Sequence, residues 1–267
     1  MMLKLSKTYI KKVFYSLGIE IRKVENYGHS YPRDFMYGCL YQAAKNGLQP
    51  KTIVDVGAAN GTPALYQIFP EAKHILVEPL EEFSSDLEQI VSQLKKAEYI
   101  AAAASNQTGT TVINVHPDLV GSSIYQEEED SDVNGFDRIV PTVTLDEICT
   151  NAVEPFLIKI DAQGAEIDVL TGGLQTLKKT ECVILEVSLF NFFKGAPVFD
   201  ECIDFMKERG FVVYDIFDLK YRLLDGAMSQ IDIAFVPEKS ELRKFHFYAT
   251  REQRKKQNQR LKKSVGK

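Results

Sequence analysis

The sequence predicts an α/β fold with a seven-stranded, mostly parallel sheet, an antiparallel last strand and helices on both faces. Two observations carry this prediction. Short apolar runs alternate with helical patterns through the middle of the chain, which is typical of βαβ units. The last two runs are joined by a polar stretch without a long helix, and such a connection suits an antiparallel pair.

The predicted strands are apolar runs short enough to be buried on both faces of a sheet. They are residues 51–57, 74–79, 99–105, 156–161, 182–188, 211–217 and 231–237. Helical patterns fall between them at about 63–69, 80–96, 164–179 and 198–209. A parallel open sheet binds ligands beyond the carboxyl ends of its strands, so the candidate site residues are sought there.

Length and composition suggest one α/β domain with two appended segments. We divide the 267 residues into an N-terminal helical segment (1–48), the α/β domain (49–238) and a basic C-terminal tail (239–267). The four cysteines are scattered without a CxxC pair, which indicates neither a zinc site nor a disulfide framework. No apolar run is long enough for a membrane span, and lysines interrupt the first residues where a signal peptide would be apolar. We therefore expect a cytoplasmic protein.

The end of the first predicted strand carries an acid followed by a turn of small residues. Asp55 precedes a turn that contains Gly57, Ala58, Ala59, Asn60 and Gly61. A dinucleotide site needs G-x-G-x-x-G, whereas this turn is one residue shorter and has an acid ahead of it, which is unfavourable beside a pyrophosphate. S-adenosylmethionine carries an ammonium and a sulfonium group and no phosphate. We predict that Asp55 binds the ammonium group of this cofactor and that the N–H groups of the turn bind its carboxylate. The alternative is a purely structural turn with a buried Asp.

Other strand ends supply further candidates for a nucleoside site. Glu78 lies 17 residues after Gly61, and an acid at the end of the second strand can accept hydrogen bonds from a ribose diol. This acid fits either cofactor, and a surface Glu before a Pro is its structural alternative. Additional predicted cofactor contacts are Ala103, Ser105, Asp161 and Gln163, and the adenine or substrate pocket has Ser122 and Ser123 as candidates.

Several motifs, in order, resemble the FkbM family of S-adenosylmethionine-dependent methyltransferases over roughly residues 50–237. They are "IVDVGAANG" (53–61), "VPTVTLDEI" (140–148), "LIKIDAQGAEIDVLTGG" (157–173) and "QIDIAFV" (230–236). The resemblance implies a Rossmann-like class I methyltransferase fold. It also implies methylation of hydroxyl groups, often on sugars and natural products.

The end of the fourth predicted strand holds the candidates for catalysis. Transfer of a methyl group to an alcohol needs an oxygen held about 3–3.5 Å from the methyl carbon and a group that accepts its proton. Lys159 and Asp161 share one face of the strand. Asp161 is the first choice, as general base, as a group that orients the hydroxyl or as a metal ligand. Lys159 is its counter-ion or a second catalytic group, and Glu166 opens the next helix, where an acid is favoured by the helix dipole.

Two further residues remain candidates for the reaction. Glu186 lies on the next predicted strand, so it can come near Asp161. Such a pair would suit Mg²⁺ or act as one base with a raised pKa, while a structural role for Glu186 is equally open. His116 is an alternative general base, although a lone His before Pro is more often a loop residue.

The two ends of the chain are basic, whereas the body is acidic. Residues 1–23 carry a net charge of +5 and residues 239–267 carry +9, so the rest carries −19 of the total of −5. Residues 3–17 also have an amphipathic helical pattern, with Leu3, Tyr9, Ile10, Val13, Phe14 and Leu17 opposite Lys4, Lys7 and Lys11. This helix covers the sheet or a second copy of the chain, or else it attaches to an anionic membrane surface, at its inner face, or to a glycan-assembly complex. Nucleic acid is a weaker alternative, because the tail has few aromatic residues.

The leading hypothesis is an S-adenosylmethionine-dependent O-methyltransferase that acts on a hydroxyl group of a saccharide or another small molecule. A nicotinamide-dependent oxidoreductase is disfavoured by the short turn and by Asp55. A non-catalytic protein that binds the cofactor, or that serves as a scaffold in a glycan-assembly complex, is the third alternative.

Overall fold

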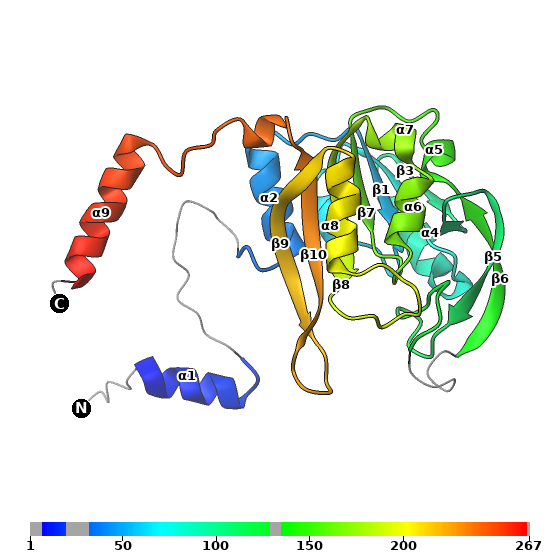
Figure 1. Ribbon diagram of the computed structural model, residues 1–267, viewed down its shortest axis with the longest axis horizontal. Coiled ribbons are helices and arrows are strands. Elements are labelled where there is room, and N and C mark those ends of the chain that lie inside the picture. The colour runs from blue at the N-terminus through cyan, green and yellow to red at the C-terminus, as the bar shows by residue number, and fades with distance from the viewer. Residues whose placement is uncertain (1–6, 20–31, 129–134, 266–267) are drawn as a thin grey trace. The chain divides into compact units, whose positions relative to one another are not determined.

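A computed structural model of the chain describes residues 7–19, 32–128 and 135–265 (Figure 1). Its contacts divide the chain into two units, Met1–Pro32 and Arg33–Lys267. In the first unit the described residues form helix α1 (Lys7–Ser16). The second unit contains the sheets and all the remaining helices of the described part. Leu3 and Lys4, two residues of the predicted amphipathic helix, lie outside the described residues.

The main sheet has the predicted architecture. Its strands are β1 (Thr52–Val56), β2 (Lys73–Val77), β3 (Ala97–Ile100), β7 (Phe156–Ile160), β8 (Thr180–Ser188), β9 (Phe211–Tyr221) and β10 (Met228–Pro237). They are ordered β3-β2-β1-β7-β8-β10-β9. Only β10 is antiparallel to its neighbours, β8 and β9, while the other pairs of this sheet are parallel. The seven-stranded, mostly parallel sheet with an antiparallel last strand is therefore confirmed.

The third predicted strand is divided between two sheets. β3 ends at Ile100, and the chain turns before β4 (Ala103–Ala104). β4 pairs with β6 (Phe136–Val143), which in turn pairs with β5 (Gly109–Val115) in a second, three-stranded sheet. Because β3 is an edge strand of the main sheet, the residues after it are free to pair elsewhere. The apolar run 99–105 gave no sign of this division.

The helices follow the predicted segments with one interruption. They are α2 (Met36–Lys45), α3 (Pro63–Ile68), η1 (Glu81–Phe83) leading into α4 (Ser84–Gln93), α5 (Leu145–Ile148), α6 (Glu166–Thr171), α7 (Leu174–Leu177), α8 (Phe199–Glu208), η2 (Glu241–Arg243) and α9 (Arg251–Val265). The predicted helix 164–179 breaks into α6 and α7 at Gly172 and Gly173. A Cβ at Gly172 would lie 2.1 Å from the Ser105 carbonyl oxygen, so the break allows close contact with another segment.

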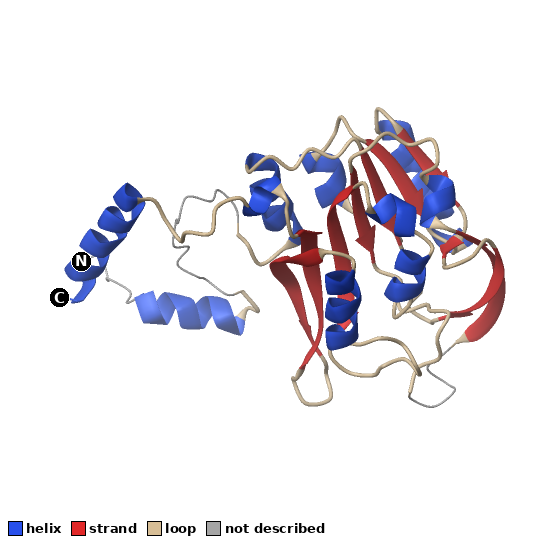
Figure 2. Ribbon diagram, turned by 45° about the horizontal axis from the view of Figure 1, so that its top comes forward, coloured by secondary structure: helices blue, strands red, loops and turns tan. Residues whose placement is uncertain are grey.

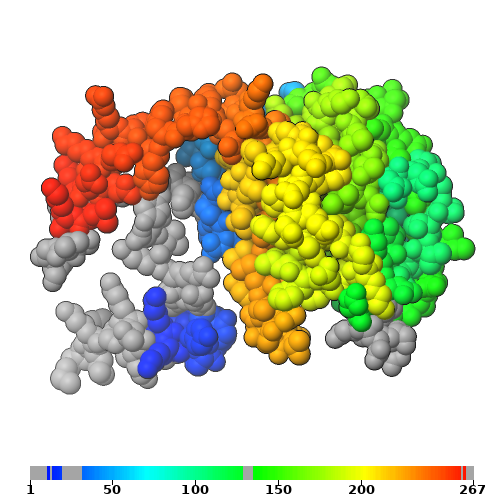
Figure 3. Space-filling view, viewed as in Figure 1, coloured from blue at the N-terminus to red at the C-terminus, as the bar shows by residue number. Residues whose placement is uncertain are grey.

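Helices cover both faces of the main sheet (Figure 2). On one face, α5 to α8 pack on Val54, Ile158, Val183 and Ile233. Figure 3 shows α8, in yellow, spread over this face. On the other face, α2 and α3 pack on the alternate strand residues, such as Ile53. The contacts thus group α2 with the sheet, whereas the sequence grouped residues 36–45 with the N-terminal segment.

The four cysteines, Cys39, Cys149, Cys182 and Cys202, are buried and free. Among the described residues, no helix combines the length and the apolar character that crossing a bilayer requires.

Candidate active site

A cavity of about 320 Å³ lies where β1, β2 and β7 end, at the edge of the sheet where ligands of parallel sheets are expected. Its volume is within the usual range of small-molecule sites. The chain segments that line it come from the turns after β1, β2 and β7, from the second sheet with the loop 118–124, and from β9 and β10. Polar lining residues are Glu78, Asp118, Ser122, Ser123, Asp161, Gln163, Lys220 and Gln230, and apolar ones include Leu80, Phe83, Ala103, Ile113 and Leu119.

The turn after β1 packs against the turn after β7. Gly57 has φ +65°, and a Cβ there would lie 1.8 Å from the Asp161 carbonyl oxygen, so only glycine fits. Ala59 has φ +43°, in the left-handed region that favours glycine. Its N–H donates to Glu78 Oε2 at 3.0 Å. Ala59, which stands where the G-x-G pattern has its second glycine, therefore adopts a left-handed conformation and donates its backbone N–H to Glu78.

Three other amides of this turn also have protein partners. The N–H groups of Gly57 and Ala58 both donate to the Val77 carbonyl, and the N–H of Gly61 donates to the Ala58 carbonyl. The predicted use of turn amides for the carboxylate of a donor is therefore not supported at these positions. Ala58 is buried, and Asn60 is directed to Asp86, to which its Nδ2 donates at 2.7 Å.

Asp55 lies beneath this turn, in a network of its own. It is 1% exposed and is not among the lining residues. Its carboxylate accepts hydrogen bonds from Thr62 Oγ1 at 3.1 Å and from Tyr66 Oη at 3.0 Å, and Lys159 Nζ lies 3.5 Å from Oδ1. Three protein partners thus occupy the carboxylate that the sequence assigned to an ammonium group. The hydroxyl group of Thr62 donates to Asp55 and does not cap α3, although Thr at the N-cap position commonly caps the helix with its side chain.

Glu78 lines the cavity from the end of β2. Its two carboxylate oxygens accept the N–H groups of Ala59 and Leu80, each at 3.0 Å, which fixes the side chain. Burial raises the pKa of Glu78, while the two amides work in the opposite direction. Each oxygen keeps a second lone pair for a ligand hydroxyl group.

Asp161 and Gln163 form the part of the lining that follows β7. Gln163 has φ +48°, and its backbone carbonyl oxygen accepts a hydrogen bond from Ser123 Oγ at 2.6 Å. Its side-chain Nε2 donates both to Asp161 Oδ1 and to Glu186 Oε2, each at 2.8 Å. Lys159 Nζ lies 3.7 Å from Asp161 Oδ2, as expected for two residues on one face of a strand. Gln163 therefore connects two carboxylates from neighbouring strands.

Glu186 is the centre of a polar cluster at the β8 end. Its side chain is about 5% exposed and binds three cavity-lining residues: Gln163, Gln230 through Nε2 at 3.0 Å, and Lys220 through an ion pair. Burial raises the pKa of Glu186, and Asp161 raises it further. Burial alone would lower the pKa of Lys220, but the Glu186 carboxylate outweighs it and raises that pKa.

Asp232 and Lys159 complete the charged cluster from beneath the cavity. Asp232 on β10 is paired in register with Glu186, and burial together with Glu186 raises its pKa to about 8. Lys159 is buried; burial opposes its charge, but Asp161 and Asp55 raise its pKa. Four carboxyl groups, those of Asp55, Asp161, Glu186 and Asp232, thus surround two lysines, Lys159 and Lys220. The cluster is then an environment that favours a cation.

The structure divides the predicted site residues into two groups. Those that line the cavity are Gly57, Ala59, Glu78, Ala103, Ser122, Ser123, Asp161 and Gln163. Those outside its lining are Asp55, Ala58, Asn60, Gly61, Ser105, His116, Lys159 and Glu186. His116 instead holds a turn, with Nδ1 at 2.7 Å from Asp118 Oδ1, and Ser105 donates its N–H to the Val143 carbonyl in the second sheet.

Asp118 of the loop 118–124 was missed, and so were two cavity residues of the last two strands, Lys220 and Gln230. The latter two are paired across β9 and β10 and reach the cavity from a hairpin nearly sixty residues beyond the turn at Gln163. The antiparallel pair itself was predicted from the sequence, but which of its residues face the site depends on the register, and that register contains irregularities near Gln230.

A magnesium ion shared by Asp161 and Glu186 does not fit this arrangement. The Gln163 amide donates to both carboxylates and so occupies the position between them. Within the described ranges, no group of three or more His, Cys, Asp or Glu residues is placed to hold a metal ion.

The chain is similar in sequence to known methyltransferases. The model of the methyltransferase FkbM domain matches residues 55–213, from Asp55 near the end of β1 into β9. The 2-O-methyltransferase NoeI of Sinorhizobium fredii (strain NBRC 101917 / NGR234) is 30% identical over 161 residues, which are 54% of this chain and 65% of that protein. The match thus covers a little less than two thirds of that relative.

Two solved structures have a weaker likeness to this chain, both at low sequence identity. Magnesium protoporphyrin IX methyltransferase of Synechocystis PCC 6803, with bound SAM, has a TM-score of 0.45 at 12% identity, covering 89% of this chain and 100% of that one. Fibrillarin of Aeropyrum pernix, with natively bound S-adenosyl-L-methionine, has a TM-score of 0.39 at 15% identity, covering 73% and 74%.

The domain match begins at the buried acid of the first turn and includes the whole Asp161–Gln163 loop, and it spans more than half of the chain. Most of the segments that line the cavity lie within this match, while Lys220 and Gln230 lie beyond it. Because the match covers more than half of the chain, the resemblance found in the sequence is confirmed: the chain belongs to the FkbM family of methyltransferases.

Proposed function

We propose that the protein is an S-adenosylmethionine-dependent O-methyltransferase whose acceptor is a hydroxyl group of a saccharide or another small polyhydroxylated molecule. The observation that carries the proposal is the placement of two carboxylates, Glu78 and Asp161, on one cavity at the carboxyl ends of neighbouring parallel strands. Family membership supports the reaction class, and the name of the relative NoeI supports a hydroxyl acceptor.

The lining residues suit the nucleoside part of the donor. Glu78 keeps free lone pairs for the ribose hydroxyl groups, and Leu80, Phe83 and Ile113 offer an apolar surface for the adenine ring. When bound, the donor supplies an electrophilic methyl group on a sulfonium.

The charge of the cavity favours this donor over a dinucleotide. Its acidic lining residues are Glu78, Asp118 and Asp161, whereas Lys220 is the one Lys or Arg among the lining residues, and it is paired with Glu186. A pyrophosphate would meet net negative charge here, and a sulfonium cation would be stabilised by it. A nicotinamide-dependent oxidoreductase is disfavoured for this reason.

The cluster around Glu186 supports a hydroxyl-rich acceptor. Gln163, Lys220 and Gln230 come from three elements and are fixed by the same carboxylate. All three line the cavity, and their remaining hydrogen-bonding groups can bind several hydroxyl groups at once. Asp161, beside Gln163, is then the group that orients the reacting hydroxyl and accepts its proton.

The test is release of S-adenosylhomocysteine from S-adenosylmethionine with a panel of mono- and oligosaccharides and small alcohols. The wild-type protein should turn over at least one acceptor. Asp161→Asn should lose about a hundredfold or more of this turnover, in line with the loss of a general base. The matched control, Asp204→Asn on the exposed surface of α8, should keep it.

Two outcomes would count against the proposal. Turnover that survives Asp161→Asn would remove that residue from the reaction. Binding of the donor with no turnover on any acceptor class in the panel would favour the third hypothesis, a protein that binds the cofactor without using it.

A further inference from the structure

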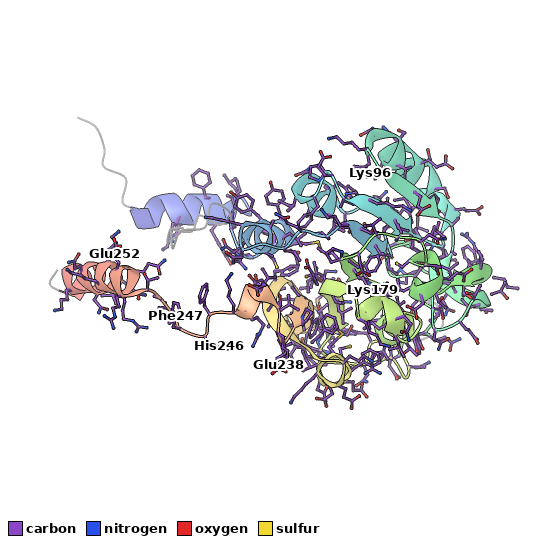
Figure 4. The ribbon with its side chains drawn as sticks, turned by 90° about the horizontal axis from the view of Figure 1, so that it is seen from above. Lys96, Lys179, Glu238, His246, Phe247 and Glu252 are labelled. Carbon is purple, nitrogen blue, oxygen red and sulfur yellow. The ribbon has the colours of Figure 1, made fainter. Side chains whose placement is uncertain are left out.

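The C-terminal tail carries a group of aromatic side chains in solvent. Phe245, Phe247 and Tyr248 are 66%, 58% and 76% exposed, and the first two rings are in contact, 5.3 Å between centroids and tilted by 49°. Figure 4 shows Phe247 standing clear of the ribbon. Single exposed apolar residues are ordinary, but three aromatic rings within four residues form a patch that indicates an interaction.

A strongly basic helix follows this aromatic patch directly. α9 contains seven Lys or Arg residues and one acid, Glu252, over fifteen residues. Its start is fixed by a reciprocal cap, because the Gln253 N–H donates to Thr250 Oγ1 and the Thr250 N–H donates to Gln253 Oε1. Arg251, Arg254, Lys255 and Lys256 are all exposed. The tail therefore offers apolar rings and positive charge side by side.

The N-terminal unit repeats the same combination. α1 is a basic helix, and Phe14, Tyr15 and Leu17 at its end are 37%, 77% and 68% exposed. Its sequence places Tyr9, Ile10, Val13, Phe14 and Leu17 at helical spacing on one side and its lysines on the other. A basic amphipathic helix of this kind lies in the interface of a membrane.

We propose that the two basic ends bind an anionic membrane surface, with the tail from Phe245 to α9 and the helix α1 as two attachment points. Acidic lipid headgroups complement the +5 and +9 charges of the two ends. The exposed rings enter the boundary between headgroups and acyl chains, where aromatic side chains are favoured. Two weak attachments in one chain combine into stable binding, since one alone is marginal.

The apolar side of α1 favours a membrane over nucleic acid. The phosphate backbone of a nucleic acid would bind the lysines of α1 but would leave its apolar residues in water. A bilayer binds the lysines through its headgroups and buries the apolar residues. The acidic body, with its net charge of −19, is repelled by either partner. Attachment is therefore confined to the ends, and the body with its cavity stays in solvent.

The experiment is co-sedimentation of the full chain with vesicles of phosphatidylcholine and phosphatidylglycerol in equal parts, and with vesicles of phosphatidylcholine alone. We expect binding to the mixed vesicles only, decreasing as salt is raised. The triple variant Arg254→Gln, Lys255→Gln, Lys256→Gln should bind about tenfold or more weakly. Phe245→Ser combined with Phe247→Ser should also weaken binding.

Matched controls come from the body of the protein. Lys96→Gln, Lys178→Gln and Lys179→Gln remove the same number of exposed charges; Lys96 and Lys179 are marked in Figure 4. Leu223→Ser with Leu224→Ser removes two exposed apolar side chains of the β9–β10 hairpin. These controls should bind like the wild type, and all variants should bind S-adenosylhomocysteine equally.

Three results would overturn the proposal: equal binding to neutral vesicles, full binding by the tail variants, or binding to a single-stranded oligonucleotide in the absence of vesicle binding.

Discussion

Glu166 is a buried carboxyl group whose protonation should control the stability of the protein near neutral pH. It stands at the start of α6, is 3% exposed, and its Oε1 accepts the N–H groups of Ala162 and Gly164 at 3.0 and 3.2 Å. These contacts hold the loop that contains Gln163 against the cavity. Burial raises the pKa of Glu166 from 4.5 to about 7, although the backbone N–H groups oppose the shift.

The sign of the effect follows from proton linkage. A carboxyl group with a raised folded-state pKa binds a proton more tightly in the folded protein than in the unfolded chain. Its stabilising contribution is complete below the unfolded value of 4.5 and is lost as the pH rises through about 7. For this group, lowering the pH from 8.5 to 5.5 should add about 2 kcal/mol to the free energy of unfolding.

Glu166→Gln isolates this contribution. A glutamine carbonyl oxygen can accept the same two N–H groups, and the side chain has no charge to desolvate at any pH. The variant should therefore be more stable than the wild type at pH 8.5, and its advantage should shrink by about 2 kcal/mol at pH 5.5. Guanidinium unfolding at the two pH values, extrapolated to water, measures the difference, and the same substitution at exposed Glu88 of α4 serves as the control.

Groups that titrate in both proteins cancel in this comparison, so Asp232, whose pKa is also raised, does not disturb it. An equal free-energy difference between wild type and Glu166→Gln at the two pH values would contradict this expectation, and so would a variant that is less stable than the wild type at pH 8.5.

Three other substitutions test the site. Gly57→Ala should lower the free energy of unfolding by about 2 kcal/mol or more, because a positive φ alone costs about 1–2 kcal/mol and the new Cβ meets the Asp161 carbonyl. Gly210→Ala is the control: Gly210 has φ +79° and a Cβ there would have nothing within 4 Å, so this variant should lose only the free energy due to the positive φ. Equal losses for the two variants in thermal unfolding would contradict the steric contribution at Gly57. Glu78→Gln should weaken calorimetric binding of S-adenosylhomocysteine by about tenfold or more, because one backbone N–H then faces an amide nitrogen, and unchanged affinity would exclude Glu78 from the donor site. Glu186→Gln should raise the KM for the acceptor while leaving the affinity for S-adenosylhomocysteine unchanged, since the charge that holds Lys220 is removed; a loss confined to the donor would place the cluster at the wrong end of the cavity.

The sequence predicted the main sheet because each strand is a local apolar run and each crossover is a local helical pattern. It failed where structure depends on distant partners. The run 99–105 reads as one strand, and only pairing with β6 draws Ala103 and Ala104 into a second sheet. Likewise the pattern over 164–179 is helical throughout, and the break at Gly172 reflects the close approach of Ser105.

The site was predictable to the extent that strand ends reveal it. Glu78 and Asp161 follow buried strands, and both line the cavity. Asp55 also sits at the end of a strand, but its partners Thr62 and Tyr66 come from the helix that follows, and they turn a candidate ligand group into a buried network. Lys220 could not be found from the sequence, because its position depends on the register of β9 with β10.

Isothermal titration calorimetry of the wild-type protein with S-adenosylhomocysteine and, separately, with NAD⁺ distinguishes the two classes of cofactor. An acidic cavity built for a sulfonium cofactor should bind S-adenosylhomocysteine at one site per chain and give no heat of binding with NAD⁺. Binding of NAD⁺, or no binding of S-adenosylhomocysteine to the folded protein, would contradict the account.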